Sequence, residues 1–213
     1  MAANTDARKP RRILVLYAHP LPDQSEVNRP LALIAANTDG VTLVDLYAEY
    51  PDLDIDVERE QQRLRDHDVI VFLHPLYWYS TPAILKQWQD LVLERGFAYG
   101  DNGTALRGKL FFSAISAGGP EDAYDSAGYN NFTLLELLSP LQQTANLCGM
   151  RWLPPFALFS ARMATEDQRL EQHLSDWSAL LEALRDRRLD LSAAIALPRL
   201  NADLAPLIKG PAQ

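Results

Sequence analysis

The stretch DVIVFLHPLYWYSTPAILKQW, residues 68–88, predicts a strand, a loop and a helix in immediate succession. Residues 68–74 form an apolar run that is typical of a strand buried on both faces of a sheet. Thr81 is a candidate N-cap, and Pro82 suits the first helical position because its missing N–H costs nothing there. The loop is the unusual part, since aromatic rings fill positions 77–79, where polar side chains are usual.

The same alternation of strand and helix runs through most of the chain. Further strands are expected at residues 12–19, 41–47, 109–116 and 152–160, and further helices at 29–38, 57–67, 133–147 and 165–187. This alternation predicts an α/β fold with a doubly wound parallel sheet covered by helices on both faces. Ligands of such sheets bind beyond the carboxyl ends of the strands. The segments after the first, third and fourth strands are therefore the candidate site.

The length and composition fit one generous globular domain. The chain has 213 residues, of which 47% are hydrophobic and 23% are charged. We expect a flexible N-terminal arm at residues 1–11, a domain at 12–187 and a tail at 188–213. The tail is semi-apolar, so docking on a neighbouring subunit and a floppy tail both fit its sequence.

Charge and cysteine content exclude several functional classes. A formal net charge of -8 argues against nucleic-acid binding, which requires basic surface. No stretch approaches the roughly 18 consecutive apolar residues of a membrane span. The polar start carries no secretory signal pattern, and the single cysteine, Cys148, excludes an internal disulfide. We therefore expect a protein of the reducing cytoplasm.

The first candidate loop, AHPLPDQSEVNRP at residues 18–30, suits a phosphate. It contains neither the dinucleotide fingerprint nor the P-loop pattern. Pro30 cannot donate a backbone hydrogen bond, which places the helix start near Asn28. Free amides at that helix start, together with the Ser25 hydroxyl and the Asn28 carboxamide, favour an anion. The alternative is that Ser25 and Asn28 merely cap the helix.

The histidines do not predict a metal site. His19 and His74 both end strands, and these strands are adjacent if the strand order is 2-1-3-4-5. No further histidine, cysteine or spaced carboxylate joins them, so no metal is expected. His67 and His173 fall on charged helices, where we expect them to face solvent.

The other two loops suit a flat, polar-edged ring. The aromatic residues 77–79 can stack on a heterocycle while backbone amides bond its edge, or they can simply cover the core. The third loop, at 115–131, carries Gly118-Gly119, which let backbone approach a ligand closely or permit positive φ angles. Tyr124 and Tyr129 then suggest a lid with phenol donors, against the alternative of an ordinary long turn. Together the three loops predict a flavin mononucleotide (FMN) site.

The motifs ILVLYAHP, SEVN, HPLYWYSTPAILKQWQDLVLERGFAYG and AISAGGPEDAY resemble those of the flavodoxin-like NAD(P)H:quinone oxidoreductases. Within that family, the sequence is most similar to the ancillary proteins of glutathione-gated potassium-efflux systems. The resemblance covers residues 12–165. It implies a five-stranded, flavodoxin-like sheet of order 2-1-3-4-5.

The resemblance also implies which residues hold the flavin. His19 and the run Ser25, Glu26, Val27 and Asn28 match the segment for the phosphate and ribityl chain. The isoalloxazine segment is matched by Leu76, Tyr77, Trp78 and Tyr79, and the third flavin-binding segment by Ser116, Ala117, Gly118 and Gly119. Trp78, Tyr79 and Tyr124 match positions that line the substrate pocket.

Two positions depart from the animal quinone reductases. Tyr124 matches the tyrosine that assists the charge developing on the reduced flavin, but a histidine six residues later is replaced by Asn130. Asn130 can donate a hydrogen bond but cannot become a cation. The family's TTGG pattern has become residues 116–119, Ser-Ala-Gly-Gly, which removes one hydroxyl. We expect Tyr124 and Asn130 to be the catalytic residues.

The implied activity is that of an NAD(P)H dehydrogenase (quinone). NADH or NADPH would reduce the flavin at N5 and leave, and a quinone would then take two electrons in a ping-pong cycle. FMN is favoured over FAD by the short first loop, and a homodimer is implied. Two other functions stay open: a redox-sensing regulatory subunit of a membrane potassium/proton antiporter, bound to the inner face of the cell membrane, and a flavodoxin-type electron carrier.

Overall fold

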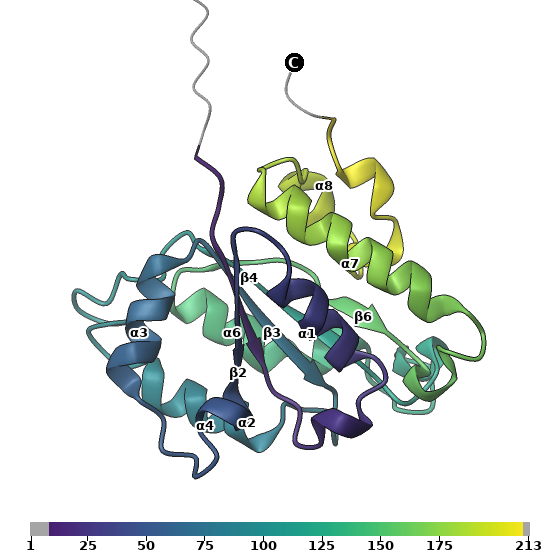
Figure 1. Ribbon diagram of the computed structural model, residues 1–213, viewed down its shortest axis with the longest axis horizontal. Helices are drawn as coiled ribbons and strands as arrows, with labels where there is room; N and C mark the ends of the chain where they lie inside the picture. The colour runs from purple at the N-terminus through teal and green to yellow at the C-terminus, as the bar shows by residue number, and fades with distance from the viewer. Residues whose placement is uncertain (1–8, 211–213) are drawn as a thin grey trace, which may run out of the picture.

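The computed structural model describes residues 9–210, which form a parallel sheet between two layers of helices (Figure 1). The strands are β1 (Ile13–Tyr17), β2 (Val41–Asp45), β3 (Val69–Pro75), β4 (Leu110–Ser116), β5 (Arg151–Trp152) and β6 (Phe156–Leu158). Their order is β2-β1-β3-β4-β5, with β6 also paired to β4. This confirms the predicted flavodoxin-like order. The strands β1, β3 and β4 are buried along their whole length, as expected for central strands of a parallel sheet covered on both faces.

The register brings the predicted loops to one edge. Tyr17 at the end of β1 pairs with Leu73 of β3, and Pro75 at the end of β3 pairs with Ser116 at the end of β4. All these pairings are parallel, so the loops that follow the three strands leave the sheet on the same side.

Helices cover both faces of the sheet (Figure 1). One face carries α1 (Asn28–Ala36) and α7 (Arg169–Arg185), and the other carries α3 (Val57–Asp66), α4 (Ala83–Val92) and α6 (Ser139–Leu147). Short helices complete the chain: α2 (Leu46–Glu49), α5 (Leu134–Leu137), α8 (Leu191–Ile195) and the 3-10 turns η1 (Pro22–Gln24), η2 (Glu121–Tyr124), η3 (Ala161–Met163), η4 (Leu200–Ala202) and η5 (Ala205–Leu207). Two apolar cores result, one on each face of the sheet.

Several predicted elements have different limits. The strand expected at 41–47 ends at Asp45, whose carboxylate accepts the Tyr47 and Ala48 amides and so begins α2. The helix expected at 133–147 is two helices, α5 and α6, joined at Leu138. The strand expected at 152–160 is divided into β5 and β6, because the prolines between them cannot donate to a ladder.

Two helix ends also differ from prediction. The helix expected at 165–187 is shorter, spanning Arg169–Arg185 as α7. Pro82, and not Thr81, occupies the N-cap position of α4, which has no side-chain cap. Because Pro82 has an extended ψ of 151°, helical geometry begins one residue later than expected.

The C-terminal segment packs on its own domain as far as the structure describes it. Leu200, Leu204 and Leu207 are buried in the same core as α1 and α7. Figure 1 shows this segment, in yellow, beside α7. A floppy tail is therefore wrong for residues 188–210, while docking on a neighbouring subunit stays a prediction. Of the expected N-terminal arm, residues 1–8 lie outside the described residues, and the Arg11 amide donates to the Arg185 carbonyl at 2.8 Å.

His67 and His173 are buried, against expectation. His67 Nε2 lies 2.8 Å from the Thr42 hydroxyl, which joins α3 to β2. His173 is 3% exposed, and its ring stacks on Phe156 with centroids 4.4 Å apart. Charged neighbours in sequence misled the prediction. His173 lies on the face of α7 that packs against β6, and His67 follows the last residue of α3, where its ring reaches Thr42 of β2.

His173 gives folding stability a pH dependence. Burial, reinforced by Arg169 and Arg199, lowers the pKa of His173 to about 4. An unfolded histidine has a pKa near 6.5, so unfolding takes up a proton below that pH. We expect His173 to cost about 2 kcal/mol of the free energy of unfolding at pH 5 relative to pH 7.5. The loss begins as pH falls through 6.5 and is complete below 4.

Urea unfolding at pH 7.5 and pH 5 measures this effect. His173→Phe keeps a ring against Phe156 but has no titrating group. The acid-induced loss should therefore be about 2 kcal/mol smaller in His173→Phe than in the parent. Equal losses in both proteins would contradict the prediction, because the carboxylates that also titrate in this range are common to both.

Candidate functional site

The first loop ends at the N-terminus of α1, which begins at Asn28 as predicted. The Ser25 hydroxyl accepts the Arg29 amide of the first turn at 3.1 Å, while Val27 occupies the N-cap position. Among residues 9–210, the amides of Glu26, Val27 and Asn28 donate to no protein group. This helix start therefore offers several backbone donors and the positive end of the helix dipole to an anion.

Asn28 does not act as a cap; it joins the first loop to the third. Its Nδ2 donates to the Ser116 hydroxyl at 3.0 Å, and the side chain is 1% exposed. Its Oδ1 is buried and has no hydrogen-bond partner among the described residues. A buried carbonyl oxygen without a donor is costly, so this atom favours a ligand or water that supplies one.

His19 lies between the first and second loops. Its Nδ1 accepts the Leu21 amide at 3.2 Å, and its Nε2 lies 3.5 Å from the Tyr77 hydroxyl. Burial lowers the pKa of His19, so the ring is neutral near pH 7. With Nδ1 acting as acceptor, the proton lies on Nε2 and points toward Tyr77.

The aromatic residues form a tight turn with unpaired backbone amides. Trp78 and Tyr79 have φ angles of 48° and 62°, and the Ser80 amide donates to the Tyr77 carbonyl at 3.0 Å. Two consecutive residues with positive φ make this a turn of the I′ type, which is strained for side chains as large as these. Within residues 9–210, the amides of Trp78 and Tyr79 donate to no protein group. Strain of this kind clusters at functional sites.

The exposure of these rings decides between the two readings of the aromatic loop. Trp78 is 93% exposed, and Tyr77 and Tyr79 are each 45% exposed. Only Leu76 turns into the core, with its amide bonded to the Ser116 carbonyl at 2.8 Å. The reading that the rings cover the end of the core is therefore wrong.

The third loop passes close to the ends of β3 and β6. The Ala117 amide donates to the Leu158 carbonyl and the Ser160 amide to the Gly119 carbonyl, both at 2.8 Å. Neither Gly118 nor Gly119 has a positive φ, so that expectation is wrong. At Gly119, a Cβ would lie 3.3 Å from the Tyr124 ring, so this glycine lets the ring pack against the backbone, while close approach to a ligand stays a prediction. At Gly118, a Cβ would meet nothing within 4 Å.

A cavity of about 900 Å³ opens beside this loop. Its walls come from the aromatic turn and from the third loop: Tyr79, Gly119, Pro120, Asp122, Ala123, Tyr124, Asp125, Ala127, Gly128, Tyr129 and Asn130. The Tyr79 hydroxyl donates to Asn130 Oδ1 at 3.1 Å and so joins the two walls. Burial raises the pKa of Tyr124, partly offset by the Gly119 backbone, so its phenol keeps its proton at neutral pH.

The structure thus brings most predicted site residues into two neighbouring groups. Around the ends of β1, β3 and β4 lie His19, the Ser25–Asn28 segment, the 76–79 turn and Ser116. Tyr124 and Asn130 line the adjoining cavity with Tyr79. Sequence reasoning missed Phe159, whose ring packs 5.3 Å from that of Tyr124. No local pattern marks this contact, since it depends on how β6 pairs with β4.

The sequence matches a family described as having a flavodoxin-like fold over residues 11–181. The chain belongs to the flavodoxin-like family. Among its relatives is the glutathione-regulated potassium-efflux system ancillary protein KefG of Serratia proteamaculans (strain 568). KefG is 48% identical over 172 residues, which cover 79% of this chain and 93% of KefG.

Solved structures of the same family include general stress protein 14 of Treponema denticola in complex with FMN. That protein is 37% identical with a TM-score of 0.77, over 81% of this chain and 99% of its own. A protein from P. pentosaceus described as an NADPH-quinone reductase is 32% identical with a TM-score of 0.72, over 79% and 96% of the two chains. These matches confirm the family resemblance of the sequence motifs.

Residues 9–210 contain neither a candidate metal cluster nor a candidate membrane-spanning helix. No group of three or more histidine, cysteine, aspartate or glutamate side chains there is arranged to hold a metal ion. Within the same residues, every helix is too short or too polar to cross a membrane.

Proposed function

We propose that this protein is an FMN-dependent NAD(P)H:quinone oxidoreductase. The observation that carries the proposal is the convergence of unpaired polar backbone and side-chain groups at one edge of the sheet. The free amides before α1, the buried Asn28 Oδ1 and the free amides of Trp78 and Tyr79 all belong to loops at that edge. The FMN complex of the Treponema denticola relative and the P. pentosaceus reductase support it.

The residues present fit FMN in size and chemistry. The N-terminus of α1 and the amides of residues 26–28 suit its phosphate, which several backbone donors can hold without a basic side chain. Amides of the aromatic turn and open space at Gly118 suit the polar edge and face of a flat ring. Bound FMN would supply a two-electron carrier between NAD(P)H and a quinone, which the protein itself lacks.

The protein's part is then to shape the pocket and stabilise charge. Tyr124 keeps its proton and faces the cavity, so it can donate a hydrogen bond to a developing anion. Asn130 Oδ1 accepts a hydrogen bond from the Tyr79 hydroxyl. The NH₂ group of the same side chain can therefore donate to a substrate. Trp78 and Tyr79 offer ring faces on which a nicotinamide or a quinone can stack.

The visible spectrum of the purified protein tests the proposal directly. Cofactor released by denaturation should be FMN by chromatography, with FAD as the alternative. Addition of NADH or NADPH under nitrogen should bleach the flavin band, and a quinone should restore it. A protein that binds no flavin after reconstitution would overturn the enzyme proposal.

Removal of the Tyr124 hydroxyl should slow the reaction without unfolding the protein. A single hydrogen bond to a charged group is worth roughly 1.5 kcal/mol, so Tyr124→Phe should lower kcat/KM about tenfold. Tyr99→Phe is the matched control, because Tyr99 is also a partly buried tyrosine but does not line the cavity. Stopped-flow reduction of both variants gives the comparison, and equal rates in Tyr124→Phe and the parent would remove Tyr124 from the mechanism.

A regulatory role beside a membrane transporter is a second candidate. It is favoured by the 48% identity to a potassium-efflux ancillary protein. In this role the protein would bind the inner face of the cell membrane through a potassium/proton antiporter. Potassium flux from vesicles containing the antiporter, with and without this protein, tests the role independently of quinone reduction.

We also propose a homodimer, in which the exposed Trp78 and Tyr129 rings would be covered. The two rings belong to the aromatic turn and the cavity wall, so a second subunit there would complete the pocket. Light scattering coupled to size-exclusion chromatography tests the dimer, and a monomer at micromolar concentration would contradict it.

A further inference from the structure

We infer that Arg199, on the C-terminal segment 188–210, is a positioning residue for the cavity wall that carries Tyr124. The wall in question is η2 (Glu121–Tyr124) together with the Gly119 backbone. The inference deepens the proposed function, because Tyr124 matters to catalysis only if that function holds.

The segment is first fixed to the edge of the sheet by Asn201. Its Oδ1 accepts the Ala157 amide at 3.0 Å, and its Nδ2 donates to the Ala157 carbonyl at 2.9 Å. The neighbouring Leu200 is fully buried, and its amide donates to the Pro155 carbonyl at 2.8 Å. The Asn201 side chain therefore pairs with β6 as another strand would, and this fixes where Arg199 can reach.

Arg199 then contacts the cavity wall from two directions. Its Nη2 lies 3.0 Å from Glu121 Oε2 at the start of η2. Its guanidinium carbon lies 5.9 Å from the centre of the Phe159 ring, and Phe159 packs against the Tyr124 ring at 5.3 Å. Arg199 thus contacts Glu121, the first residue of η2, and also Phe159, whose ring packs against Tyr124, the last residue of η2.

The internal bonds of the wall are local, which makes an outside contact important. The Ala123 amide donates to the Pro120 carbonyl at 3.2 Å, and the Asn130 amide to the Ala123 carbonyl at 3.1 Å. Its N-cap, Pro120, supplies no side-chain hydrogen bond. A short turn of this kind opens easily unless something beyond the loop restrains it. The Ser160 amide restrains the Gly119 end of the wall, and Arg199 adds a restraint on η2 from the C-terminal segment.

Hydrogen exchange at the Ala123 and Asn130 amides tests the inference without turnover. Arg199→Met removes an exposed ion pair and a cation–π contact. We therefore expect it to raise both exchange rates about fivefold. Glu121→Gln should raise them by less, since it leaves the Phe159 contact in place. The double variant should equal Arg199→Met alone, because both substitutions remove the same ion pair.

Arg188→Met is the matched control. Arg188 lies on the same segment, pairs with Asp186 at 3.6 Å, and has a side chain 26% exposed against 21% for Arg199. Exchange at Ala123 and Asn130 should not change in this variant. An unchanged rate in Arg199→Met, or an equal rise in Arg188→Met, would overturn the inference. Either result is independent of whether the protein reduces quinones.

Turnover adds a second readout where the reductase activity is present. Arg199→Met should lower kcat with little change in the KM for NAD(P)H, and Arg199→Lys should recover part of the loss. In a Tyr124→Phe background, Arg199→Met should cause no further loss, because its effect passes through Tyr124. Additive losses would show that Arg199 acts elsewhere.

Discussion

Gly118→Val should fold like the parent protein and bind FMN roughly 10- to 100-fold more weakly. Gly118 has no positive φ, so a β-branched residue causes no backbone strain there. A Cβ at this position meets no protein atom within 4 Å, although it lies among the three loops of the proposed site. The added methyl groups would occupy space proposed for the flavin. Fluorescence titration with FMN measures the affinity, and thermal unfolding shows that the fold is intact.

The design includes a graded variant and a control. Gly118→Ala adds only the Cβ and should weaken FMN binding less than Gly118→Val does. Gly210→Val is matched, because Gly210 also has open space around its Cβ but lies far along the C-terminal segment. It should bind FMN as the parent does. Parental affinity in Gly118→Val would place the flavin away from the third loop.

The sequence predicted the central strands well because these are buried on both faces. The runs at 12–19, 68–74 and 109–116 became β1, β3 and β4 with small changes at their ends. Where the predicted end of a strand was wrong, a single side chain or a pair of prolines set the observed end. Asp45 ends β2 by capping α2, and the apolar pattern that continues past it carries no sign of this.

The location of the site could be predicted from the topology, whereas the hydrogen bonds between its residues could not. Parallel strands of similar length place their following loops at one edge, so the three loops could be named in advance. The bond from Tyr79 to Asn130 and that from Asn28 to Ser116 join residues 51 and 88 positions apart. Such contacts depend on loop conformations that no local pattern encodes. The contact between Arg199 and Phe159 could not be predicted from the sequence for the same reason.

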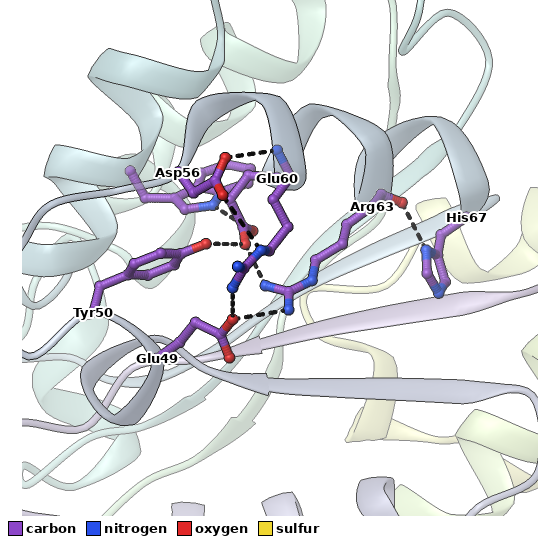
Figure 2. A network of polar contacts seen from close by, with 8 residues as sticks. Glu49, Tyr50, Asp56, Glu60, Arg63 and His67 are labelled. Atoms are coloured by element: carbon purple, nitrogen blue, oxygen red, sulfur yellow. Dashed lines mark hydrogen bonds and ion pairs between the residues drawn. The ribbon is translucent and has the colours of Figure 1, made fainter.

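Glu60→Gln should lower the free energy of unfolding by about 3 kcal/mol. Glu60 is a fully buried carboxylate on α3, at the centre of the polar network in Figure 2. Its Oε1 accepts the Tyr50 hydroxyl at 2.7 Å and pairs with Arg63, and its Oε2 accepts the Trp88 indole N–H at 2.9 Å. An amide in its place has one acceptor atom, so either Tyr50 or Trp88 faces an N–H group, and Arg63 loses one of its two acidic partners.

The size of the loss separates this network from an ordinary surface ion pair. Removal of one member of a buried pair costs several times more than the 0–1 kcal/mol of an exposed one. For a domain of this size, 3 kcal/mol lowers Tm by roughly 6–12 °C. Glu58→Gln is the control, because Glu58 lies on the same helix and is exposed. It should shift Tm by no more than about 2 °C. Equal shifts in both variants would mean that helix charge, and not the buried network, holds α3 against α4.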